Sequence, residues 1–212
     1  LGMKLSFNII STKAIILILL LVLVSNQPGF AETTEIRVKF KNLRNTPCYL
    51  GFHFGKNKYI RDTATIDDKG YCLFKGDKKN FPSGVYLIVV PGNEYFELIV
   101  NEDKISLETD TTDFVKNMNV VKSQENKVFY HYLKYIRAFE NTMSALNKQG
   151  ESARKLNDQE ELKKLNSTAL KLREEQLKHK DSIFSNFSNL FITKLLKSTD
   201  EPTPRKKLGT ET

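Results

Sequence analysis

The chain has 212 residues, of which 40% are hydrophobic, so it is long enough to bury the core of one or two small domains. Its formal net charge is +8, but basic and acidic side chains are interspersed, so the charge pattern does not favour a nucleic-acid-binding protein. With only two Cys and no Trp, the composition excludes a small scaffold held together by many disulfides.

The first 31 residues have the pattern of a secretory signal peptide. Lys4 and Lys13 flank a short polar start, an uninterrupted apolar run covers residues 14–24, and a Gly-Phe-Ala sequence ends at Ala31. The apolar run is roughly half the length of about 20 residues that a membrane-spanning helix requires. We therefore expect cleavage between Ala31 and Glu32, export to the periplasm or cell envelope, and no membrane span in the mature chain.

Residues 32–113 predict a small antiparallel β-sandwich. Apolar and polar side chains alternate in most of this region, as in strands with one buried face, and Gly, Pro, Asn and Asp separate the alternating segments. Seven strands are predicted, at residues 36–40, 48–54, 59–66, 71–75, 85–90, 95–100 and 105–109. Short strands separated by turns at regular intervals are typical of a sandwich or barrel.

Residues 114–198 predict a helical hairpin. The hydrophobic period changes here to alternate steps of three and four residues, which place one apolar stripe along a helix. The stripe consists of Phe129, Tyr132, Ile136, Phe139, Met143 and Leu146. The predicted first helix covers residues 124–149, with Ser123 as its N-cap and Gly150 as its end.

A second helix is predicted for residues 158–184 and a short third helix for residues 190–197. Asn157 and Glu160 have the spacing of a capping box at the start of the second helix. We expect the two long helices to pair antiparallel. Residues 199–212 have nothing to bury and are expected to form a disordered tail. The expected fold class is α+β, with a small antiparallel β-sandwich followed by an α-helical hairpin.

The two cysteines, Cys48 and Cys72, are expected to be buried and unpaired. An even number of cysteines in an exported chain permits a disulfide, but the spacing is not that of a redox-active C-x-x-C motif. If residues 59–66 form a strand between the two cysteine strands in one sheet, the thiols lie about 10 Å apart. A disulfide requires Cα atoms within about 7 Å, so we expect two free thiols.

The other residue types that carry chemistry give weak patterns. The three histidines, at positions 53, 131 and 179, lack the spacing of metal ligands. The acidic group Glu108, Asp110 and Asp113 could coordinate a hard cation, but turn and helix-start chemistry accounts for it better. Core packing is the better interpretation of the aromatic strand residues, against a sugar-stacking platform. These aromatic residues are Tyr49, Phe52, Phe54, Tyr59, Tyr86, Tyr95 and Phe96. We therefore expect no catalytic, cofactor or metal site.

The order of the strand segments resembles a known family. The matching segments are YLGFHFGKNKYIRDTATIDDKG (49–70), GVYLIVVP (84–91), YFELIV (95–100), SLETDTTD (106–113) and ENKVFY (125–130). Together they resemble an N-terminal domain of unknown function found in exported Bacteroidetes-type proteins. In that family a thioredoxin-like domain with a Trp-Cys-x-x-Cys motif usually follows, and the full protein is a periplasmic thiol:disulfide oxidoreductase.

This chain departs from the family pattern because it has neither Trp nor a C-x-x-C motif. No catalytic residue is therefore carried over, and we expect no enzyme activity. The resemblance implies a non-catalytic accessory domain, in a stand-alone or truncated form, that positions or binds a thioredoxin-like partner. Self-association through the helical hairpin is a second interaction that the apolar stripe permits.

The alternative function is a free-standing module that binds a glycan or another component of the cell envelope. A cluster of exposed aromatic side chains on one sheet face would favour this alternative. A large apolar patch on the helical hairpin would favour the accessory domain instead.

Overall fold

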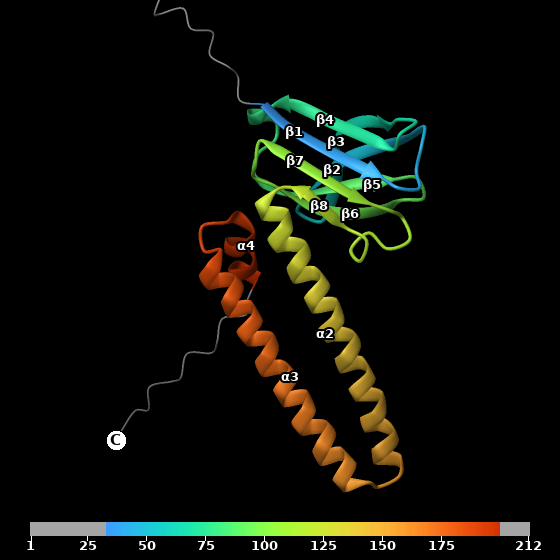
Figure 1. Cartoon of the computed structure of the whole chain (residues 1–212), viewed down its shortest axis with the longest axis vertical. Coiled ribbons are helices and arrows are strands. Elements are labelled where there is room, and N and C mark those ends of the chain that lie inside the picture. The colour runs from blue at the N-terminus through green and yellow to red at the C-terminus, as the bar shows by residue number, and fades with distance from the viewer. Residues whose placement is uncertain (1–32, 200–212) are drawn as a thin grey trace, which may run out of the picture. The chain divides into compact units, whose positions relative to one another are not determined.

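The computed structural model describes residues 33–199 (Figure 1). The expected signal peptide, its cleavage site between Ala31 and Glu32, and the expected tail from residue 200 onward lie outside the described residues. Among the helices that are described, none combines the length and the apolar character needed to cross a membrane.

Two four-stranded sheets form the first part of this region, and their inner faces share one core (Figure 1). One sheet has the order β4-β1-β7-β8 and the other the order β3-β2-β5-β6. The strands are β1 (Thr33–Phe40), β2 (Thr46–Phe54), β3 (Asn57–Ile66), β4 (Tyr71–Asp77), β5 (Gly84–Val90), β6 (Glu94–Val100), β7 (Lys104–Thr109) and β8 (Asn119–Lys122). A short 3-10 helix, Lys78–Asn80, follows β4. The predicted sandwich is confirmed.

The alternation of side chains along the strands builds the core. Ile36, Val38 and Phe40 of β1 are fully buried, while the residues between them are more exposed. Leu50 of β2 and Ile88 of β5 are also fully buried in the same cluster. Burial of such side chains contributes about 1.5–3 kcal/mol each and is the main force that holds the sheets together.

Two features of the sheets were not predicted. β1 pairs antiparallel with β4 but parallel with β7, so the first strand lies inside its sheet rather than at an edge. An eighth strand, β8, pairs antiparallel with β7 in a segment that the sequence assigned to the helical region.

The chain changes sheet at the turn between β3 and β4. Gly70 has a φ of +90°, and a Cβ atom there would lie 2.3 Å from the carbonyl oxygen of Phe40, so the turn requires glycine. Asp67 Oδ1 accepts hydrogen bonds from the backbone N–H groups of Lys69 (2.9 Å) and Tyr71 (2.8 Å). These bonds lower the pKa of Asp67. The turn was predicted to connect neighbours in one sheet, and this prediction is wrong.

The second part of the region is helical, with α2 (Gln124–Lys155), α3 (Gln159–Asn186) and α4 (Phe191–Thr199). Figure 1 shows α2 and α3 side by side in an antiparallel hairpin, as predicted. The helices begin at polar caps: Ser123 Oγ accepts from the N–H of Asn126 at 3.0 Å, which confirms the predicted N-cap.

The ends of the hairpin turn differ by a few residues from the prediction. α2 continues past Gly150, because nothing forces a left-handed conformation there, and it ends before Asn157, whose φ is +54°. The N-cap of α3 is Asp158, whose Oδ1 accepts from the N–H of Glu161 at 3.0 Å. The predicted capping box at Asn157 and Glu160 is therefore displaced by one residue.

Candidate functional site

The start of α2 is hydrogen-bonded to the edge strand β6. Asn126 is fully buried, its Nδ2 donates to the carbonyl oxygen of Ile99 at 2.8 Å, and its Oδ1 accepts from the N–H of Ile99 at 2.8 Å. The side-chain amide thus satisfies both backbone groups of Ile99, as a neighbouring strand would. Unpaired backbone groups at a sheet edge are otherwise free to pair with another chain.

Glu125, next to it in the sequence, connects three elements. Its side chain is almost completely buried, and its carboxylate accepts from the N–H groups of Phe191 (2.8 Å) and Ile192 (2.9 Å) at the start of α4. It also accepts from Asn101 Nδ2 at 2.8 Å, just after β6. A carboxylate in this position satisfies free N–H groups and interacts favourably with the positive end of the helix dipole.

Further along α2, one side chain per turn binds the sandwich. The Tyr130 hydroxyl donates to the carbonyl oxygen of Glu97 at 2.5 Å, and its burial raises the pKa of Tyr130. Lys134 Nζ donates to the carbonyl oxygen of Met118 at 2.8 Å. These contacts fix the direction in which the hairpin leaves the sheets.

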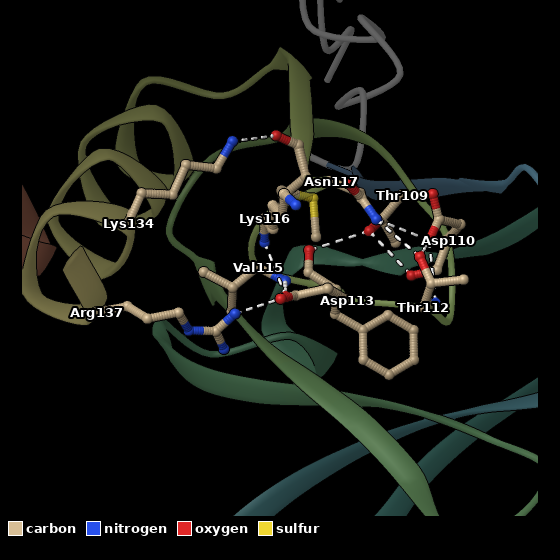
Figure 2. Close-up of polar contacts among 11 residues, drawn as sticks. Thr109, Asp110, Thr112, Asp113, Val115, Lys116, Asn117, Lys134 and Arg137 are labelled. Atoms are coloured by element: carbon tan, nitrogen blue, oxygen red, sulfur yellow. Dashed lines mark hydrogen bonds and ion pairs between the residues drawn. The ribbon is translucent and has the colours of Figure 1, made fainter. Parts of the chain in front are cut away.

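The last of these contacts is made to the loop between β7 and β8, which Figure 2 shows. Arg137 donates to Asp113 Oδ1 at 2.6 Å, and the same oxygen accepts from the N–H groups of Val115 (3.1 Å) and Lys116 (3.0 Å). These hydrogen bonds lower the pKa of Asp113, with the Lys116 N–H as the strongest contributor. Asp113 therefore folds the loop and fixes α2 through a single carboxylate.

The acidic group of the sequence analysis does not form a cation site. Asp110 Oδ1 accepts from the hydroxyl and the N–H of Thr112 and from Asn117 Nδ2 (2.9 Å), which lowers its pKa (Figure 2). Glu108 lies on the other face and pairs with Lys39 at 3.6 Å. Within residues 33–199, no group of three or more His, Cys, Asp or Glu side chains has an arrangement that could hold a metal.

An open pocket of about 640 Å³ lies between β6, the loop at residues 111–115 and α2. Its lining includes Tyr95, Glu97, Asp113, Tyr130 and Arg137, and the last three already hydrogen-bond each other or the backbone. These groups stabilise the junction, so the pocket gives no specific indication of catalysis.

The two cysteines meet in the core. Cys48 of β2 and Cys72 of β4 are both buried, with their Sγ atoms 3.5 Å apart. The predicted burial is confirmed, but the predicted separation of about 10 Å is wrong. The reason is the change of sheet after β3, which places the two strands on opposite sides of the sandwich core rather than in one sheet.

Two of the three histidines also come together. The ring centroids of His131 on α2 and His179 on α3 are 5.1 Å apart, and the ring of Tyr135 stacks on His179 at 3.7 Å. Burial and the neighbouring His131 lower the pKa of His179. His53 lies elsewhere, beside Glu97 at 3.7 Å. The antiparallel register of the hairpin brings this pair together, and the spacing of the histidines in the sequence could not indicate it.

The exposed tyrosines of the strands do not gather into one platform. Tyr95 is 44% exposed, but Lys58 Nζ lies 3.8 Å from the centre of its ring, where a sugar would stack. Tyr59 stacks on Phe52 at the inner side of the sandwich, and Tyr71 lies on the outer face of the other sheet. Most of the other aromatic strand residues are buried or half-buried, as expected.

The helical hairpin exposes leucines. Leu170 and Leu177 of α3 are 60% and 51% exposed and lie seven residues apart, so they share one face about 10 Å apart along the helix. Leu156, in the turn between the helices, is 79% exposed. An open groove of about 510 Å³ runs beside Leu162 and Leu170. We refer to Leu156, Leu170 and Leu177 as the hairpin leucines.

Comparison with protein families, curated proteins and solved structures finds no match to this chain. The resemblance to an exported Bacteroidetes-type domain is therefore still an expectation from the sequence.

Proposed function

We propose that this chain is a non-catalytic interaction module that binds a protein partner through the hairpin leucines. The observation that carries the proposal is a helical arm with exposed apolar side chains whose base is fixed to a sandwich. Leucines that share one exposed helix face are the kind of side chain that an apolar groove of a partner protein contacts in helix-in-groove recognition.

The fixed base gives the arm a defined direction. Asn126, Tyr130 and Arg137 bind the sandwich at intervals of about one or two helical turns, and Glu125 holds α4 against the same base. A rigid arm loses little conformational entropy when it binds, so a small apolar contact suffices for recognition.

The first partner to test is a thioredoxin-like domain with a Trp-Cys-x-x-Cys motif. This choice rests on the resemblance of residues 49–130 to the exported domain, and on the expected export of the chain. In this proposal the chain binds the thioredoxin-like partner and holds it in position, and the partner carries out the redox chemistry.

The glycan-binding alternative is not favoured by a specific feature. The three most exposed strand tyrosines, Tyr59, Tyr71 and Tyr95, lie on separate surfaces. An open stack of rings is what sugar recognition would need.

The experiment is a calorimetric titration of the purified chain with a purified thioredoxin-like domain. The test variant is Leu170→Glu with Leu177→Glu, which places two charges on the apolar face. The control is Thr142→Glu with Gln149→Glu, because these neutral side chains are also exposed and seven residues apart, but on α2.

We expect the test variant to weaken binding at least tenfold and the control to bind like the unmodified chain. Equal binding by both variants, or no binding by the unmodified chain, would refute the proposal. Sedimentation velocity of the chain alone tests whether the hairpin leucines bind a second copy of this chain instead. A dimer that only Leu170→Glu with Leu177→Glu dissociates would show that the partner is a second copy of this chain.

A further inference from the structure

The two buried thiols lie where a bond between them would join the two sheets. Cys48 belongs to the sheet β3-β2-β5-β6 and Cys72 to the sheet β4-β1-β7-β8. Their Sγ atoms are 3.5 Å apart, so a disulfide of about 2.05 Å requires an approach of roughly 1.5 Å. Small changes in the side-chain angles and a slight movement of the sheets can supply such an approach.

Cys72 lies beside an open cleft, although its side chain is almost completely buried in the folded chain. An open cleft of about 590 Å³ is lined by Cys72 together with Thr63, Ala64 and Thr65 of β3. β3 and β4 are the edge strands of their sheets, so the cleft lies between two edges. Edge strands have a sheet neighbour on one side only, and they open locally at a lower free-energy cost than central strands.

From this geometry we propose that Cys48 and Cys72 form a disulfide that joins the two sheets when the protein folds in the presence of a disulfide oxidant. The expected export of the chain to an oxidising compartment is consistent with this site but is not required for it. The site is independent of the hairpin leucines.

Formation of the bond is a two-electron oxidation by a small disulfide such as oxidised glutathione. The Cys72 thiolate attacks one sulfur of the oxidant, which forms a mixed disulfide and releases one small thiolate. The Cys48 thiolate then attacks Cys72 Sγ, which forms the protein disulfide and releases the second small thiolate. The two protons lost by the protein thiols end on the two released thiols, and the two electrons reduce the oxidant.

The fold controls when this reaction occurs. The hydrogen bond between the two thiols and their burial raise the pKa of Cys48. Thiolate is the reactive form, so the raised pKa of Cys48 slows the second step, the attack of Cys48 on Cys72 Sγ, in the native core. Oxidation is therefore slow in the folded, reduced chain and fast while the two sheets are still assembling.

The test is oxidative refolding of the purified chain. The reduced, denatured protein is refolded in a glutathione redox buffer, quenched with acid, alkylated and digested without reduction. We expect mass spectrometry to find one peptide pair joined through Cys48 and Cys72 within a single chain. We also expect this form to melt roughly 5–10 °C above the reduced form, because the bond closes a loop between residues 24 positions apart.

Two control variants, Cys48→Ala and Cys72→Ala, should lose the dependence of the melting temperature on the redox buffer. The measurement on the unmodified chain stands even if a variant does not fold. Two alkylated cysteines after oxidative refolding would overturn the proposal, as would disulfides that form only between chains. Native protein treated with the same buffer should react at least tenfold more slowly than refolding protein, and an equal rate would contradict the protection by the fold.

Discussion

The contact between Asn126 and Ile99 allows a sharp test of how the helical arm is attached. Asn126→Ala removes both hydrogen bonds to Ile99 and leaves its N–H and C=O groups without partners. Ile99 is fully buried, so water does not readily replace the lost partner.

The expected loss of stability follows from these two groups. An unsatisfied buried polar group costs about 1–3 kcal/mol, so two groups cost about 2–6 kcal/mol. Alanine is the better helix former by about 0.5 kcal/mol, which offsets part of the loss. The net expectation is a decrease of about 1.5–5.5 kcal/mol in the free energy of unfolding.

Urea unfolding followed by far-ultraviolet circular dichroism measures this change. Asn147→Ala is the matched control, because Asn147 is also on α2 but is exposed, and we expect it to change stability by less than about 0.5 kcal/mol. If Asn126→Ala loses less than about 1 kcal/mol, the side-chain amide does not act as a partner for β6 and our account of the junction is wrong.

Three further predictions concern the helices. Glu125→Gln removes the charge that caps α4, so it should speed amide hydrogen exchange at Phe191 and Ile192. It should also destabilise the protein by about 1–3 kcal/mol. Unchanged hydrogen exchange at these two amides would contradict the capping role of Glu125. The lowered pKa of His179 favours the neutral form in the folded state, so stability should fall as the pH drops below about 6.5. The loss of stability at low pH should be smaller in His179→Gln than in the unmodified chain. If the melting temperatures of the two proteins depend on pH in the same way, His179 does not cause the loss. Phe139→Asp should destabilise the hairpin by several kcal/mol, because Phe139 lies half-buried in the stripe between the helices. An unchanged melting temperature would show that the stripe is solvated.

Strands such as β1 and β7 could be predicted from the sequence because each has one buried face, which imposes alternation. The division of strands between sheets could not. The turn at Asp67 and Gly70 has the same residue types whether the chain continues in one sheet or crosses to another. The strand β8 was missed because it is short and has a register shift opposite β7, so its alternation is interrupted.

The helix start at Ser123 was predictable because capping depends on local residue types, and the structure confirms it. The roles of Glu125 and Asn126 were not predictable. Polar residues in the first helical turn are normally exposed, and their partners here lie 66 and 27 positions away in the sequence. The closeness of the two free thiols was missed for the same reason, because it depends on which sheet each strand joins.

The parallel pair of β1 and β7 has a consequence for the order of folding. Glu35 is aligned with Lys104, so 69 positions separate the paired residues. β1 is the only strand between β4 and β7 in its sheet, so β4 gains a place in that sheet only through β1. Contacts between residues so far apart in sequence slow folding, because a long loop must close before they form. The backbone edge of β1 that pairs with β7 therefore stays unpaired until the seventh strand is available. During synthesis β1 and β4 can pair first, and this pair presents an open strand edge to other chains until β7 joins it.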